Sequence, residues 1–136
     1  MYQTVNEDCI AALVDNFYAK VRSDELLGPI FIAAIGSDWT AHLERMNAFW
    51  NSVLLAAGTY KGNPMIAHLQ LPRLTRPHFE RWLQLWRETA YALCTHAVAL
   101  LFIEKAEMIA ERFQHAISSF HEMARREFAT APQAIQ

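Results

Sequence analysis

Apolar residues recur along the first part of the chain with the period of an α-helix. Asn6 followed by Glu7 and Asp8 has the form of a capped helix start with acidic residues in its first turn. The apolar stripe behind it consists of Ile10, Leu13, Val14, Phe17 and Val21. This spacing predicts an amphipathic helix. Tyr18 lies beside the stripe, and a buried phenol there needs either a hydrogen-bonding partner in the protein or a ligand.

A second helical pattern follows a break at residues 26–31. The sequence LLGPIF predicts a tight corner with a short helical turn, after which residues 36–38 begin the next helix. One face of that helix carries His42, Arg45, Met46, Phe49 and Trp50. A histidine and an arginine at the leading end of an apolar face indicate either a functional site or a polar pair at the rim of a core.

Two helix starts marked by proline lie in the middle of the chain. Asn63-Pro64 opens a helix that Pro72 must end, and His68 lies near its end among apolar residues. A neutral imidazole on a short, rigid, apolar helix suits an axial ligand of a large flat cofactor, although a single histidine in such surroundings is more often a structural residue. The second helix, residues 77–93, carries one aromatic-rich stripe: Phe79, Trp82, Leu83 and Trp86.

The last part of the chain predicts one long helix. From Ala97 the apolar residues keep a helical period, with no proline or glycine before Pro132. No segment shows the alternation of a half-buried strand. We therefore expect an all-α fold in a single domain, residues 1–136, in which about 122–136 form a polar C-terminal extension that frays or protrudes.

Composition and charge limit the kinds of molecule that the chain is expected to bind. The chain has 136 residues, of which 53% are hydrophobic and 19% charged, so it can bury a core. Its net charge of −2 gives no basic surface for nucleic acid or anionic lipid. The longest apolar run, residues 97–103, is far short of the roughly 20 residues of a membrane span, and the acidic N-terminal segment is unlike a signal peptide. We expect a cytoplasmic protein.

Cys9 and Cys94 are the two cysteines of the chain, and they form no zinc-binding pattern. Two free thiols in a reducing compartment is the simplest interpretation. A single disulfide between them stays open as an alternative.

Together, these segments resemble the group III truncated haemoglobins. The resemblance rests on five separated signatures in the right order: FYAKV, LGPIF, AHLERMNAFW, PMIAHLQLP and FERWLQLW. It covers about residues 6–120, and the absence of a Gly-Gly pair agrees with the third group rather than the other two. The resemblance implies a globin-like, truncated two-over-two helical sandwich around haem b (iron protoporphyrin IX).

The resemblance also implies roles for individual residues. His68 matches the proximal iron ligand, and Tyr18 and Trp82 match distal residues that donate hydrogen bonds to the ligand. His42 matches a distal histidine that acts as a movable gate, and Phe31 matches a phenylalanine that packs on the porphyrin.

Further positions are expected around the cofactor. The resemblance places Met46 and Phe49 over the distal side of the haem. The propionates need cations or water at the rim, for which Arg45 is the first candidate and Tyr60 and Arg76 are further ones.

The implied activity is binding of dioxygen, nitric oxide, carbon monoxide or peroxide. Two donors would hold dioxygen tightly, which favours redox or detoxification chemistry over bulk transport. Nitric oxide dioxygenase or peroxidase turnover would need an external reductant, supplied by a reductase. An oxygen carrier or sensor and a haem-free helical binding module are the alternatives. We expect a monomer or weak dimer.

Overall fold

The computed structural model describes the backbone of residues 1–55 and 75–135 and the side chains of residues 1–55 and 75–116. The helix predicted from Asn63 lies outside the described residues, and so do Tyr60 and His68.

The secondary structure elements of the described residues are α-helices, as the sequence predicts. Its helices are α1 (Glu7–Ser23), α2 (Gly28–Ile35), α3 (Trp39–Leu55), α5 (Arg76–Leu93) and α6 (His96–Ile135). The β-structure found in this part of the chain is one isolated bridge between Tyr2 and Cys94. None of the helices examined within these residues is long and apolar enough to cross a membrane.

Local sequence signals set the start of α1. The Oδ1 atom of Asn6 accepts a hydrogen bond from the backbone N–H of Cys9 at 2.8 Å, which confirms the predicted cap. The whole predicted stripe from Ile10 to Val21 is buried. The helix ends before Asp24, whose extended backbone turns the chain towards α2.

The corner after α1 leads into a helix of eight residues, which is longer than the single turn that the sequence predicts. Glycine is required at both ends of it. A Cβ atom on Gly28 would lie 2.9 Å from the carbonyl oxygen of Arg22, so the close approach of α2 to α1 excludes a side chain. Gly36 ends the helix with φ of 70°, a conformation that other residues rarely adopt.

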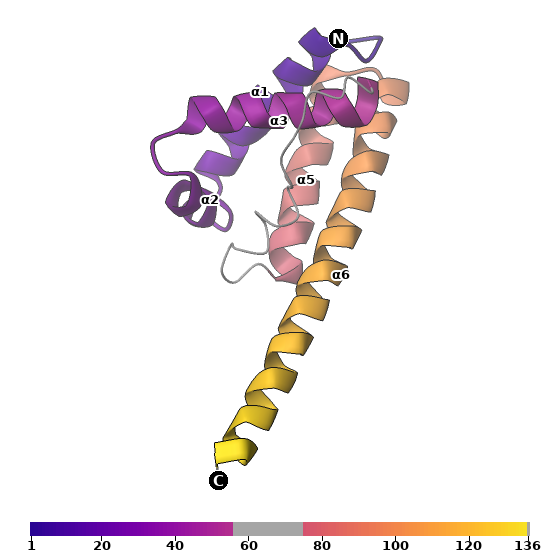
Figure 1. Ribbon diagram of the computed structural model, residues 1–136. Coiled ribbons are helices and arrows are strands. Elements are labelled where there is room, and N and C mark those ends of the chain that lie inside the picture. The colour runs from indigo at the N-terminus through magenta and orange to yellow at the C-terminus, as the bar shows by residue number, and fades with distance from the viewer. Residues whose placement is uncertain (56–74, 136) are drawn as a thin grey trace.

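The core lies where α1 packs against α5 and α3, and α5 packs along α6. Its centre is aromatic: Trp50 stacks on Trp86 with ring centroids 4.6 Å apart, and Phe17 meets Trp86 edge-on at 4.9 Å. The indole N–H of Trp86 donates to the carbonyl oxygen of Phe102 at 3.1 Å, so its polar atom is satisfied. The C-terminal half of α6 extends beyond the other helices (Figure 1).

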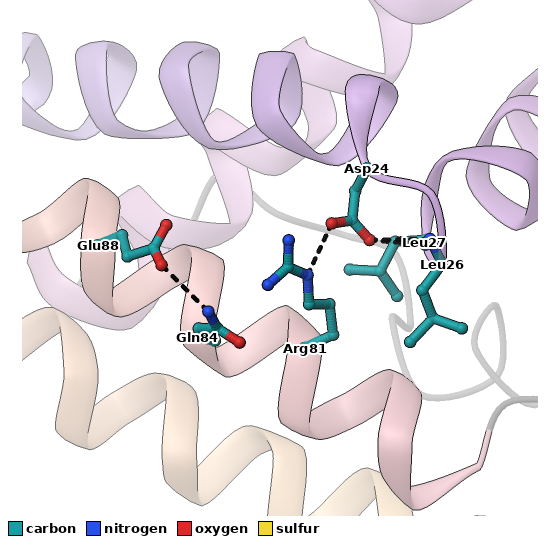
Figure 2. Close-up of polar contacts among 6 residues, drawn as sticks. All are labelled: Asp24, Leu26, Leu27, Arg81, Gln84 and Glu88. Carbon is teal, nitrogen blue, oxygen red and sulfur yellow. Dashed lines mark hydrogen bonds and ion pairs between the residues drawn. The ribbon is translucent and has the colours of Figure 1, made fainter.

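An ion pair links the α1–α2 corner to α5 (Figure 2). Asp24 accepts the Nε–H of Arg81 at 2.6 Å and the backbone N–H groups of Leu26 and Leu27 at 3.1 and 3.0 Å. Burial by itself would raise the pKa of Asp24, but the hydrogen bonds from Leu27 and Arg81 outweigh it and leave the pKa below its usual value. The ionised carboxylate therefore holds α2 in place relative to α5.

Candidate functional site

Tyr18 lies at the centre of an aromatic cluster formed by α1, α2 and α3. Its side chain is 6% exposed, and its ring meets the ring of His42 edge-on with centroids 4.8 Å apart. Phe17 and Phe31 lie 4.9 and 6.4 Å away. Burial raises the pKa of the Tyr18 phenol well above its usual range. The side chain therefore keeps its proton and remains an O–H donor.

Trp39 completes this cluster and was not among the predicted site residues. It is 8% exposed, and its ring lies 5.8 Å from that of His42 and 6.3 Å from that of Tyr18. The guanidinium carbon of Arg22 lies 4.5 Å above the Trp39 ring, a cation–π contact. The position of Trp39 three residues before His42, on the same helical face, is the signal that could have identified it.

Trp82 on α5 is partly buried and packs on the same neighbour as Tyr18. Its ring meets Phe17 edge-on at 5.7 Å and stacks parallel to Trp86 at 6.1 Å. The two predicted distal donors, Tyr18 and Trp82, thus both contact the ring of Phe17.

An apolar pocket lies between α2, α5 and α6. Its lining residues are Leu27, Phe31, His78, Phe79, Trp82, Ala110 and Phe113. Phe31 and Trp82, which were predicted as site residues, therefore share one cavity. His78 was not predicted, and its Nδ1 atom accepts the backbone N–H of Thr75 at 3.0 Å at the start of α5. The local signal that could have identified His78 is the helix start at Thr75 and Pro77, because His78 lies in the first turn of that helix.

The other predicted site residues have more varied surroundings. Met46 and Phe49 on α3 are partly buried and pack against the main core. Arg45 is exposed, and Arg76 is exposed and paired with Glu80 at 3.1 Å. The contacts proposed for Arg45 and Arg76 with a cofactor stay predictions, and so do the roles of His68 and Tyr60 outside the described residues.

The described residues fit haem in their chemistry. The pocket is lined by aromatic and aliphatic side chains, as a flat apolar macrocycle requires. The protonated phenol of Tyr18, beside the pocket, and the indole N–H of Trp82 are hydrogen-bond donors. Within the same residues, no group of three or more His, Cys, Asp or Glu side chains could hold a metal ion by itself.

Comparison with known proteins supports this description. Residues 1–119 match the model of the bacterial-like globin family. The chain is 37% identical over 122 residues to the group 3 truncated haemoglobin ctb of Campylobacter jejuni, covering 88% of this chain and 96% of that protein. It is 32% identical over 92 residues to the group 2 truncated haemoglobin YjbI of Bacillus subtilis, covering 64% and 66% of the two chains.

A solved structure agrees with the sequence matches. The fold superimposes on the crystal structure of the group III truncated haemoglobin from Campylobacter jejuni with a TM-score of 0.82. The aligned parts are 38% identical and cover 85% of this chain and 94% of the other. The predicted globin-like architecture is thereby confirmed.

Proposed function

The chain belongs to the bacterial-like globin family as a haem-binding truncated haemoglobin, and on that premise we propose how its residues hold the cofactor and act on its ligands. In this proposal the cofactor is haem b and His68 is the iron ligand. Phe31, Met46 and Phe49 would contact the macrocycle, and Arg45, Tyr60 and Arg76 would be the candidates to pair with its propionates.

The edge-on contact between the buried Tyr18 and the partly buried His42, beside the pocket lined by Phe31 and Trp82, is the observation that carries the proposal. Haem supplies the iron at which a small gaseous ligand binds. With haem present, Tyr18 and Trp82 would be the hydrogen-bond donors available to a ligand such as dioxygen. In a site that excludes water these donors face little competition from solvent.

His42 acts as a gate in this proposal. It lies near the start of α3, and its ring contacts those of Tyr18 and Trp39. Trp39 in turn carries the guanidinium group of Arg22 on its ring. Rotation of its side chain would open or close the route to the Tyr18 hydroxyl, on the timescale of rotamer exchange.

We propose redox or detoxification chemistry on nitric oxide or peroxide, with a reductase partner that returns electrons to the protein. Strong donors slow the release of dioxygen, which suits a reaction better than bulk transport. The setting we expect is a cytoplasmic protein that is monomeric or weakly dimeric. An oxygen carrier or sensor is the second candidate, because it would use the same pocket and donors.

The first experiment tests the iron ligand. Purified protein should show a Soret band, and His68→Ala should lose the haem or alter the band. If haem normally saturates the site about 1,000-fold above its Kd, its loss removes roughly 4 kcal/mol of apparent stability. His115→Ala, a change at an exposed residue of α6, is the matched control and should leave band and Tm unchanged. An unaltered Soret band and Tm in His68→Ala would contradict the assignment.

A second experiment separates reaction from transport. The oxygenated protein is mixed with nitric oxide, and in a parallel assay with peroxide, each with a competent reductant. Repeated turnover supports the detoxification function. A single stoichiometric reaction without turnover in both assays favours the carrier or sensor.

A further inference from the structure

Two buried thiols face each other at the end of the molecule away from the pocket. Cys9, in the first turn of α1, and Cys94, the residue that ends α5, are 85 positions apart in sequence. Their Sγ atoms are 3.7 Å apart, and both side chains are at most 2% exposed. We infer that Cys9 and Cys94 form a reversible intramolecular disulfide, a redox modification site separate from the haem pocket.

The geometry requires little movement. A disulfide bond is about 2.0 Å long, so the sulfur atoms must approach by about 1.7 Å from their distance of 3.7 Å. Both residues are at helix ends, where small backbone adjustments cost less than in a helix interior. The bond would close a long loop, and cross-links of this kind restrict the unfolded chain most strongly.

The surroundings of the two sulfur atoms distinguish their roles. Cys9 lies three residues after the cap Asn6, where the N-terminal end of the helix dipole favours a thiolate. Burial raises the pKa of Cys9 above its usual value, and the hydrogen bonds with Cys94 and Asn6 offset this rise only in part. Burial raises the pKa of Cys94 to about 12, and the hydrogen bond with Cys9 adds to the rise. Because Cys9 lies at a helix N-terminus and Cys94 at a helix C-terminus, Cys9 is the attacking thiol and Cys94 the resolving one.

The N-terminal strap, residues 1–5, controls access to the pair. Its Tyr2 donates a backbone hydrogen bond to the carbonyl oxygen of Leu93 and accepts one from Thr95, both at 2.9 Å. Tyr2 and Val5 also pack against the core that contains Cys9. Terminal segments open locally at much lower cost than the whole fold. Opening of the strap therefore sets the rate at which a small oxidant reaches the thiols.

The oxidant is a small-molecule disulfide, and the exchange is balanced. The Cys9 thiolate attacks one sulfur of the oxidant, which forms a mixed disulfide and releases the other half as a thiol. Cys94 loses its proton and attacks the Cys9 sulfur, which releases the second thiol. The protein gives up two electrons and two protons, and one small disulfide becomes two thiols.

The experiment incubates the haem-loaded protein in glutathione buffers of increasing oxidised fraction and follows intact mass after alkylation of free thiols. The parent should become two hydrogens lighter and lose both alkylation sites, reversibly with dithiothreitol. Oxidation should raise Tm by about 5 °C or more. Cys94→Ser should instead accumulate one glutathionyl group on Cys9, while Cys9→Ser should react far more slowly.

A strap variant keeps the test independent of how well the cysteine variants fold. Tyr2→Pro removes the N–H that bonds to Leu93 and should speed oxidation several-fold to the same product, whereas Tyr2→Phe retains the backbone bonds and should match the parent. If the parent and Tyr2→Pro both keep two alkylatable thiols at equilibrium in the most oxidising buffer, or form only glutathione adducts, the inference is wrong. The readout does not use the Soret band, so it is separate from a failure of the proposed function.

Discussion

At the scale of single residues, Tyr18 and Trp82 are the two proposed hydrogen-bond donors to a ligand. The tyrosine keeps its proton because its environment is apolar, and an indole N–H can only donate. Both are therefore donors over the whole physiological pH range. Their rings pack on Phe17, so the two donors share one structural support.

Replacing Tyr18 with Phe should speed dioxygen release by up to about tenfold. A hydrogen bond contributes about 0.5–1.5 kcal/mol, and 1.4 kcal/mol corresponds to about tenfold in an equilibrium constant. Carbon monoxide accepts hydrogen bonds weakly, so its release should change much less. Stopped-flow measurement of both gases checks this, with Tyr91→Phe, at an exposed site on α5, as the control. Equal acceleration for both gases would indicate a steric effect and contradict the donor role.

Replacing His42 with Ala should raise the association rate of carbon monoxide and leave the haem content intact. The reason is steric: the imidazole lies against Tyr18 and would no longer cover the route to it. Flash photolysis measures the rate, and His96→Ala, at an exposed site, is the matched control. An association rate equal to that of the parent would exclude the gate.

At the scale of elements, the ion pair of Asp24 and Arg81 fixes the position of α2 relative to α5. Phe31 is carried by α2 and Trp82 by α5, so this link holds two walls of the pocket at their spacing. The Asp24 side chain is 4% exposed and that of Arg81 is 37% exposed. The carboxylate consequently depends on its partners far more than the guanidinium does.

Replacing Asp24 with Asn should lower the free energy of unfolding by about 2 kcal/mol at neutral pH, because charge-assisted hydrogen bonds are lost. Glu107→Gln, which breaks the half-exposed pair with Arg87, should change it by less than about 1 kcal/mol. Because folding lowers the pKa of Asp24, its contribution is present above about pH 4 and is lost as pH falls through the folded-state pKa. Denaturant titrations of parent and Asp24→Asn should thus converge at low pH, and a constant difference would contradict the ion-pair account.

At the scale of the whole molecule, the C-terminal end of α6 lies apart from the other helices. The helix runs from His96 to Ile135, and its C-terminal half extends past the other helices (Figure 1). The match to the bacterial-like globin family ends at residue 119. Phe113, by contrast, is buried and lines the pocket.

Deleting residues 122–136 should leave the haem content unchanged and alter the free energy of unfolding by less than about 0.5 kcal/mol. Deleting residues 111–136 removes Phe113 from the pocket and should reduce both strongly. Absorption spectra and thermal melts compare the two truncations. Loss of haem in the shorter deletion would show that the extension belongs to the globin domain.

The sequence by itself determined where α1 and α5 begin, because these signals are local. Asn6 caps α1, and Pro77 lies in the first turn of α5. Helical spacing also placed His42 on the same helical face as Met46 and Phe49. The length of α2 was underestimated: Gly36 was expected to open the next helix, but with its positive φ it ends α2 after Ile35.

Only the tertiary structure decided which distant residues meet. Asp24 reaches Arg81 across 57 positions and Cys9 reaches Cys94 across 85. Trp39 closes over Tyr18 from a different helix. Periodicity defines which side of a helix is apolar, but the angle and height at which helices cross depend on the shapes of all the side chains between them. Those crossings, and with them the donor cluster and the thiol pair, cannot be read from spacing along one chain.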